Sequence, residues 1–150
     1  MKKVFLTMIT VMVLGFAANA QSAIGVRLGS GSAFNAELSF QQALSNANRL
    51  ELDLGWNNYA NGANFNFSGI YQWDWNIVGG LDWFIGPGAI VSLYSGPNNP
   101  HFGLGVGGQI GLEYTFGIPL KLSLDARPMW NFIGIAKNWG NICLGVRYVF

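Results

Sequence analysis

Charged residues, cysteine and histidine are all scarce in this chain of 150 residues. Charged side chains make up 10% of the sequence, against about a quarter in an ordinary soluble domain. The single cysteine, Cys143, excludes an intramolecular disulfide, and with the single histidine, His101, it excludes a zinc site of the Cys/His type. No basic stripe is present that could neutralise phosphates, so a nucleic-acid-binding protein is also excluded.

Apolar residues, aromatic residues and glycine are what the chain has in abundance. The hydrophobic fraction is 51%, the aromatic fraction is 15%, and there are 21 glycines. Such a sequence is too apolar and too weakly charged to remain disordered. Its length suits a single domain.

The first twenty residues have the layout of a secretory signal peptide. Lys2 and Lys3 form a positive start, an apolar stretch runs from Val4 to Ala18, and Ala18-Asn19-Ala20 is a small-residue cleavage site. A transmembrane helix is the alternative, but the stretch is short for one and no positive stop-transfer cluster follows it. We therefore expect residues 1–20 to be removed, which leaves a barrel domain of residues 21–150 with 6 basic and 7 acidic side chains.

The rest of the chain alternates apolar and polar residues with a period of two, which is the pattern of β-strands. The clearest case is the C-terminus, where Arg147 stands between apolar Val146 and Tyr148. Eight strands are predicted, with a bulge or bend at Pro87 in the fifth: 24–29, 36–41, 49–56, 64–73, 82–93, 106–116, 120–127 and 142–150.

Turn-forming residues separate these strands. If both ends of the domain lie in the periplasm, the turns there are Ser45–Asn48, Asp74–Asn76 and Gly117–Pro119. The opposite, extracellular end then carries the tight turn and the loops, namely Gly29–Ser32, Asn57–Gly62, Ser95–Pro100 and Pro128–Asn141.

The charges fall on the polar faces of the strands, and this decides which face of the sheet is in contact with water. A soluble sandwich or a lipocalin-like barrel is the alternative, yet the apolar faces are too large and too aromatic to be left in water. The prediction is an all-β, eight-stranded antiparallel up-and-down transmembrane β-barrel with a polar network in its lumen. The network comprises Arg27, Glu37, Arg49, Glu51, Asp53, Asp82, Glu113, Lys121, Asp125, Arg127 and Arg147.

Aromatic residues lie at the ends of the apolar segments, where membrane barrels carry two rings at the lipid–water interfaces. The ring predicted at the periplasmic end comprises Tyr71, Trp73, Tyr114, Phe116, Tyr148 and Phe150. The other comprises Trp56, Tyr59, Tyr94, Phe102, Trp130 and Trp139.

The sequence from Leu144 to Phe150 ends in a terminal Phe with an aromatic residue, Tyr148, two positions before it. In this it resembles the small eight-stranded outer-membrane barrels of Gram-negative bacteria, the outer membrane protein X and porin-like barrel group. The segment Ile118–Pro128 is similar to a penultimate strand of that group. The resemblance implies an outer-membrane location and a final strand, with Tyr148 and Phe150, that the barrel-assembly machinery reads. It implies no particular activity.

Three features of the sequence suggest a catalytic or cofactor-binding site, and each has a simpler structural explanation. Gly103–Gly108 spells a dinucleotide-binding fingerprint, but a period of two follows it in place of a helix. His101 has Ser92 and Ser95 near it in sequence, as a lipid-modifying enzyme would need, but no flanking carboxylate to orient its ring. Cys143 shows no sign of activation and is expected to be structural.

The paired carboxylates Glu51 and Asp53 suggest acid/base chemistry or a cation site, or alternatively a structural salt-bridge core. Side chains just fill the interior of an eight-stranded barrel, which favours the core and disfavours an open pore. We therefore expect a monomeric, non-enzymatic barrel with a structural or surface-interaction role and no metal, cofactor or nucleic acid. Its partners would be lipid and the assembly machinery, and its aromatic and Asn-rich loops would be the contact surface. A lipid-modifying enzyme using His101, or a narrow solute pore, is the alternative.

Overall fold

The computed structural model describes residues 21–30, 34–59, 62–96, 100–133 and 140–150. The predicted signal peptide and parts of the four predicted loops lie outside these residues. In the described part of the chain, no helix is both long enough and apolar enough to cross a membrane.

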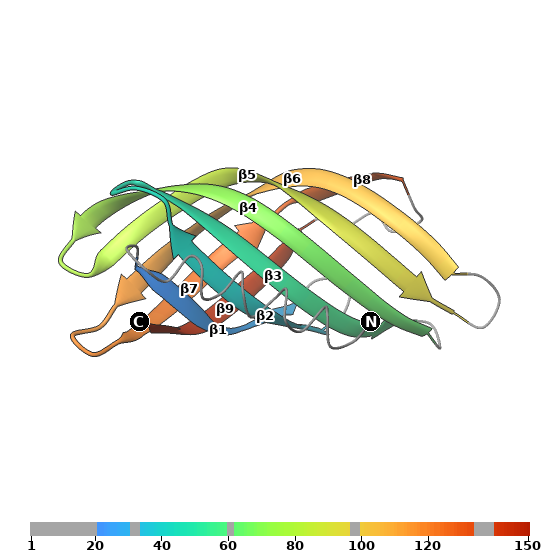
Figure 1. Cartoon of the computed structure of the whole chain (residues 1–150), viewed down its shortest axis with the longest axis horizontal. Helices are drawn as coiled ribbons and strands as arrows, with labels where there is room; N and C mark the ends of the chain where they lie inside the picture. Colours follow the sequence, from blue (N-terminus) through green and yellow to red (C-terminus); the bar gives the residue numbers. More distant parts are fainter. Residues whose placement is uncertain (1–20, 31–33, 60–61, 97–99, 134–139) are drawn as a thin grey trace, which may run out of the picture.

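Antiparallel strands make up nearly all of the described chain. They are β1 (Ser22–Ser30), β2 (Phe34–Ala43), β3 (Asn48–Tyr59), β4 (Gly62–Val78), β5 (Leu81–Ser95), β6 (Pro100–Thr115), β7 (Leu120–Arg127), β8 (Met129–Ile133) and β9 (Asn141–Val149). From β1 to β7 each strand pairs with the next along the chain, β8 pairs with β6, and β9 pairs with β7 and with β1, so the sheet closes on itself (Figure 1).

The seam of the cylinder lies between β1 and β9. Their register runs from Ala23 opposite Val149 to Ser30 opposite Ile142. The backbones of Ser22 and Phe150 extend it, because each N–H donates to the carbonyl oxygen of the other, at 3.2 and 2.9 Å. Closure removes the free sheet edges that a bilayer does not tolerate.

The segments β7 and β8 are two halves of one barrel strand. Both pair with β6, and the register that sets Ala126 opposite Ile110 continues unchanged to Met129 opposite Gly107. Pro128 interrupts the strand between them, since proline has no N–H for the ladder. The fold is thus the predicted eight-stranded antiparallel up-and-down barrel.

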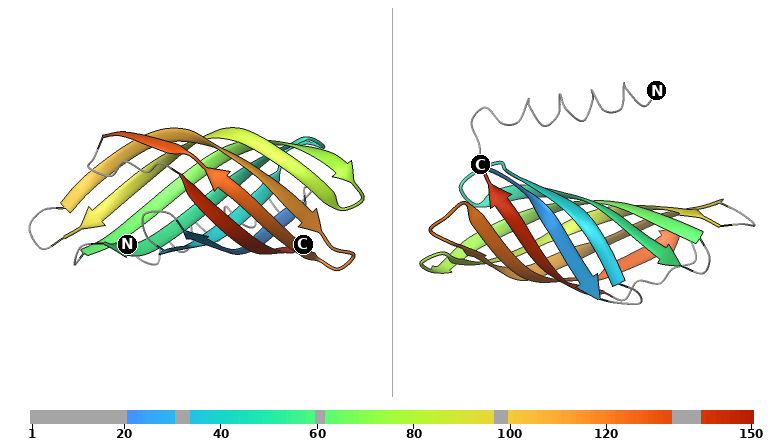
Figure 2. Two further views of the ribbon diagram at one scale, coloured as in Figure 1. Left: turned by 180° about the vertical axis from the view of Figure 1, so that it is seen from behind. Right: turned by 90° about the horizontal axis from the view of Figure 1, so that it is seen from below.

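One end of the barrel carries both termini of the described domain and three short connections, as Figures 1 and 2 show. The prediction of a turn at Asp74–Asn76 is wrong, because β4 continues through these residues to Val78. The chain instead reverses at Gly79 and Gly80, where Gly79 has φ +56°, a conformation that favours glycine over residues with a side chain.

The predicted bulge at Pro87 is not found. Ile70 pairs with Gly88 and Trp73 with Ile85 in one unbroken register, so the strands stay aligned across the proline. The register of this hairpin shifts instead between Asn76 and Val78, next to the turn.

Alternation along the strands separates two surfaces. Large apolar side chains cover the outside, among them Val26, Leu38, Leu54, Phe67, Ile85, Leu112, Leu124 and Val146. The inside is mostly polar, and its fully buried side chains include Arg27, Arg147, Gln72, Gln109, Glu51 and Glu113. A soluble protein has the reverse arrangement.

Candidate functional site: the charged lumen

Glu51 lies at the centre of the lumen, on the inward face of β3, and is completely buried. Its Oε1 accepts hydrogen bonds from Arg127 Nη2 at 2.8 Å and from Gln109 Nε2 at 3.1 Å. Its Oε2 accepts from Arg147 Nη2 at 3.0 Å and from the amides of Gln41 and Gln72 at 2.7 and 3.1 Å. One carboxylate therefore ties together side chains from five other strands.

A second group of charges lies towards the loop end of the barrel. Arg27 on β1 forms ion pairs with Glu37 and Asp125, and its Nη1 lies 3.5 Å from Asp53 Oδ2. Arg127 on β7 approaches the same Asp53 oxygen at 2.5 Å and Glu37 Oε2 at 3.5 Å. Both arginines thus pair with Glu37 and Asp53, whereas the described ion pair of Asp125 is with Arg27 alone.

The third group surrounds Glu113 on β6, nearer the termini. Arg49 Nη1 and Lys121 Nζ lie 2.6 and 3.0 Å from Glu113 Oε1, and Arg147 Nη1 lies 3.9 Å from Oε2. The guanidinium of Arg49 also lies over the ring of Phe84, 4.7 Å from its centroid, which is a cation–π contact.

These groups balance their charges. The described ion pairs connect five cations with five carboxylates: Arg27, Arg49, Lys121, Arg127 and Arg147 with Glu37, Glu51, Asp53, Glu113 and Asp125. Asp82, the eleventh predicted member, is not among them. Asp82 Oδ1 instead accepts a hydrogen bond of 2.7 Å from Asn76 Nδ2 beside the β4–β5 turn.

Uncharged side chains that the prediction left out complete the network. The amides of Gln41, Gln72 and Gln109 surround Glu51, and Gln72 also donates to Gln109 at 2.7 Å. Ser39 and Ser123 accept from Arg147 at 3.0 and 2.7 Å. All five side chains lie on the same polar strand faces as the charged residues. The alternation along the strands therefore indicated them, but the prediction included only charged residues.

The lumen changes character towards the loops. Ile70, Ile90 and Met129 form a small buried apolar cluster. Farther out, Ser92 donates to Asn66 at 2.7 Å, and Asn57 donates to Asn35. No Lys, Arg, Asp or Glu occurs among described residues 28–30, 34–36, 55–59, 62–67, 91–96, 100–105, 129–133 and 140–142.

The residues considered for catalysis are not brought into a catalytic arrangement. The His101 ring stacks on Tyr94 at 6.1 Å between centroids, and the Ser92 hydroxyl is bonded to Asn66. Cys143 is buried on the inward face of β9. Gly103–Gly108 lies within the strand β6. A dinucleotide-binding fingerprint requires a helix after its glycines, so that interpretation is excluded. No group of three His, Cys, Asp or Glu side chains suited to a metal is found in the described chain.

Aromatic residues lie on the outside at both ends. At the terminal end Trp73, Tyr114, Phe116, Tyr148 and Phe150 are exposed, and Trp75 and Trp83, absent from the predicted ring, stack at 4.7 Å. At the loop end Trp56, Phe102 and Trp130 are exposed.

Tyr94, predicted in the outer ring at the loop end, lies instead on the face of β5 that carries inward-facing Ser92. Trp139 and the side chain of Tyr59 lie outside the described parts of the molecule.

Comparison with known proteins gives a likeness in structure only. No family model and no curated protein sequence matches the chain. The N-terminal barrel domain of Pseudomonas aeruginosa OprF superimposes with a TM-score of 0.66 and 20% identity, over 88% of this chain and 100% of that one. Neisserial surface protein A gives a TM-score of 0.63 and 18% identity, over 87% and 96% of the two chains.

Ail, the attachment invasion locus protein of Yersinia pestis, is also similar in structure. In its complex with the heparin analogue sucrose octasulfate, it gives a TM-score of 0.53 and 12% identity, over 88% of this chain and 99% of Ail. At these identities the likeness establishes the fold, which is that of the small eight-stranded outer-membrane barrels. It does not transfer an activity.

Proposed function

We propose that this chain is an integral outer-membrane barrel protein that acts through its exterior, as a structural element of the membrane and as a contact surface at its loops. The observation that carries the proposal is a closed, charge-filled lumen inside a wall of exposed large apolar side chains. Lipid solvates such a wall and water does not. The predicted signal peptide would take the chain across the inner membrane.

The partners follow from the same proposal. Outer-membrane lipid covers the apolar wall, and the assembly machinery reads Tyr148 and Phe150 at the end of β9 during insertion. The protein is a monomer, because the cylinder closes within one chain through the pairing of β1 with β9.

Neither an open pore nor an enzyme is part of this proposal. The arginines and carboxylates that cross the lumen fill the space a solute would need, as expected for eight strands. An enzyme would need a base oriented next to a nucleophile, and His101 stacks on Tyr94 while Ser92 bonds Asn66.

The described part of the loop end is rich in aromatic and amide side chains, and Lys137, the one charged residue of the predicted loops, lies outside it. Its described residues carry exposed Trp56, Phe102 and Trp130 and many asparagines but no charged side chain. Aromatic faces and carboxamides bind neutral polar molecules by stacking and hydrogen bonding.

The test is fractionation of cells that express the chain, followed by gel electrophoresis with and without heating. We expect it in the outer-membrane fraction, with folded and heated forms that migrate differently. Recovery as a soluble periplasmic protein would contradict the proposal. Conductance in planar bilayers would favour the pore, and a change in lipid A acylation that His101→Ala abolishes, seen by mass spectrometry, would favour the enzyme.

A further inference from the structure

The apolar outer wall is much shorter beside the seam than on the opposite side of the barrel. The strands at the seam, β9, β1 and β2, have 9, 9 and 10 residues, whereas β4, β5 and β6 have 17, 15 and 16. The sheet order places the three short strands side by side and the three long strands side by side. We call the outward face of β1 and β2 the seam face, and that of β4, β5 and β6 the tall face.

The apolar stretch of the seam face is short on β1. Its exposed outward side chains are Ile24, Val26 and Leu28, and the next outward position towards the loops is Ser30. Leu28 lies four residues after Ile24, which is about 13 Å along the strand. A strand tilt of about 40° reduces that to a height of about 10 Å. Ser30 pairs with Phe34 of β2, so only three residues connect the two strands and the wall ends there.

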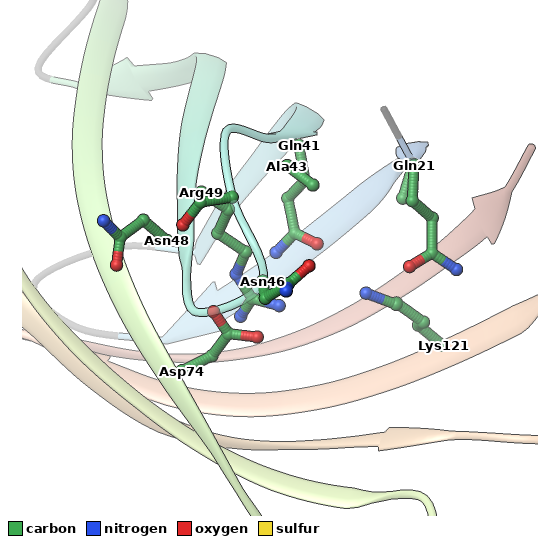
Figure 3. A pocket seen from close by; sticks show the side chains of 10 residues that line it. Gln21, Gln41, Ala43, Asn46, Asn48, Arg49, Asp74 and Lys121 are labelled. Atoms are coloured by element: carbon green, nitrogen blue, oxygen red, sulfur yellow. The ribbon is translucent and has the colours of Figure 1, made fainter. Parts of the chain in front are cut away.

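The seam face also ends early towards the termini. Gln41 and Ala43 both line the cavity at the terminal end of the lumen (Figure 3), so Gln42 between them lies on the outer face. Ser22 lies beside it on that face, because the two residues are opposite each other in the register and the Ser22 hydroxyl donates to Gln42 Oε1 at 2.8 Å. The apolar stretch of β1 is therefore bounded by a polar side chain at each end.

On the tall face the apolar stretch is more than twice as high. The outward positions of β5 run from Trp83 to Leu93 without a polar side chain, and the next one towards the loops is Ser95. That distance is about 33 Å along the strand and about 25 Å in height, which is the height of the apolar band of an ordinary transmembrane barrel. One bilayer thickness therefore cannot match both faces.

A bilayer of uniform thickness that fits the tall face would cover polar parts of the seam face with hydrocarbon. At one end these are Ser22 and Gln42, and at the other they are Ser30 and the connection between β1 and β2. Polar side chains and the backbone of a connection are costly in hydrocarbon, because no water is present to form hydrogen bonds with them. Local thinning of the bilayer around a short apolar stretch is the less costly response.

We propose that the barrel contacts a locally thinned bilayer along the seam face, while the tall face contacts a bilayer of ordinary thickness. The partner is membrane lipid, whose headgroups lie level with Ser30 on one surface and with Ser22 and Gln42 on the other. The seam where β1 and β9 close the cylinder thus lies in the thinnest part of the surrounding membrane. The inference rests on the proposed function, because it requires that the outer wall lies in lipid.

The first experiment measures how deep spin labels lie in the bilayer, with the protein in lipid nanodiscs that leave both membrane surfaces open to added reagents. In a Cys143→Ser background, labels at Ile24→Cys and Leu28→Cys test the two ends of the seam face. A label at Leu93→Cys is the reference, since it lies one outward position from the end of the tall face. We expect both seam labels to collide with a water-soluble nickel chelate as readily as the reference does.

A bilayer of uniform thickness can be level with only one end of the seam face, so it would leave at least one seam label accessible to oxygen alone. That result would overturn the proposal. Shielding of both seam labels from oxygen and nickel would also overturn it, because a protein would then cover the seam face. A label at Ala89→Cys, midway along the tall face, should collide with oxygen alone. Nickel access there would contradict the proposed function, and this inference with it.

The second experiment compares two matched variants in thick and thin bilayers. Ser30→Leu and Ser95→Leu make the same change at exposed outward positions where β1 and β5 end. Ser30→Leu lengthens the short stretch, so we expect the folding equilibrium constant to rise about three- to tenfold with 18-carbon lipid chains and less with 12-carbon chains. Ser95→Leu lies beyond a stretch that already matches the bilayer and should show no such dependence. Equal responses of the two variants would overturn the proposal.

Discussion

The lumen and the outer wall are built from the same strands, yet different forces stabilise them. On β9, Arg147 is 1% exposed and contacts Glu51, Ser39 and Ser123, while the adjacent Val146 is 40% exposed and faces outward. Stabilisation of the wall is non-directional and depends on apolar area. Stabilisation of the lumen is directional, because each buried charge needs particular partners. The wall should therefore tolerate apolar exchanges that the lumen does not tolerate among polar residues.

The largest expected loss of stability is for a substitution at Glu51. Glu51→Leu leaves Arg127 and Arg147 without one carboxylate and removes one hydrogen-bond acceptor from each of three glutamine amides. Breaking a buried pair from one side costs roughly 3–5 kcal/mol. Urea unfolding in lipid vesicles should show a loss of that size, with Glu51→Gln less affected because it keeps one acceptor oxygen. Equal stability of Glu51→Leu and the parent would mean that the network contributes nothing.

The second-largest loss of stability is expected for a substitution on the outer wall. Val146→Arg places a charge against lipid, which costs about 2–4 kcal/mol near the bilayer midplane. The same unfolding measurement should register this loss, and the yield of inserted barrel should fall. Val146→Leu is the control and should behave as the parent does. Normal stability of Val146→Arg would show that the predicted outer face is not in lipid.

A smaller loss is expected for Arg147→Ala. Glu51 keeps Arg127, and Glu113 keeps Arg49 and Lys121, so neither carboxylate becomes unpaired. Hydrogen-bonding groups such as Ser39 and Ser123 do lose a partner, and we expect a cost of about 1–3 kcal/mol. Arg147→Val should match the alanine variant and still insert. A gain in stability for Arg147→Val would contradict the assignment of Arg147 to the lumen.

The smallest effect distinguishes Asp82 from the rest of the predicted network. Asp82→Asn should change the free energy of unfolding by no more than about 0.5 kcal/mol, since it forms no described ion pair and asparagine can also accept from Asn76. Unfolding midpoints of this variant and the parent, measured together, provide the check. A loss of stability as large as that of Arg147→Ala would show that Asp82 contributes to the lumen network.

Much of this arrangement could be predicted from the sequence, because a strand has only two faces. Once β3 is assigned, Glu51 and Asp53 must share a face opposite Leu52, and the need to keep charge out of lipid decides which face is inside. The number of strands and the closure followed from the same alternation. The pattern does not specify which arginine meets which carboxylate, since that depends on the tilt and stagger of strands far apart in sequence.

The errors occurred where the alternation was not informative. At Asp74–Asn76 polar residues suggested a turn, but the positive φ of Gly79 places the reversal several residues later. At Tyr94 an aromatic residue was assigned to the lipid interface by type, although its position in β5 sets it on the inward face. Gln41, Gln72 and Gln109 were missed because charge alone was counted as evidence for the network.

The most direct test that each strand has one face in the lumen and one face in lipid compares adjacent residues of β2 in a Cys143→Ser background. Leu38 is 53% exposed and Ser39 is completely buried. With the protein in lipid vesicles, Leu38→Cys should accept a thiol-reactive spin label that collides with oxygen dissolved in the bilayer and not with a water-soluble nickel chelate. Ser39→Cys, a nearly isosteric change, should resist labelling. Ready labelling at Ser39→Cys, together with nickel access at Leu38→Cys, would contradict the account.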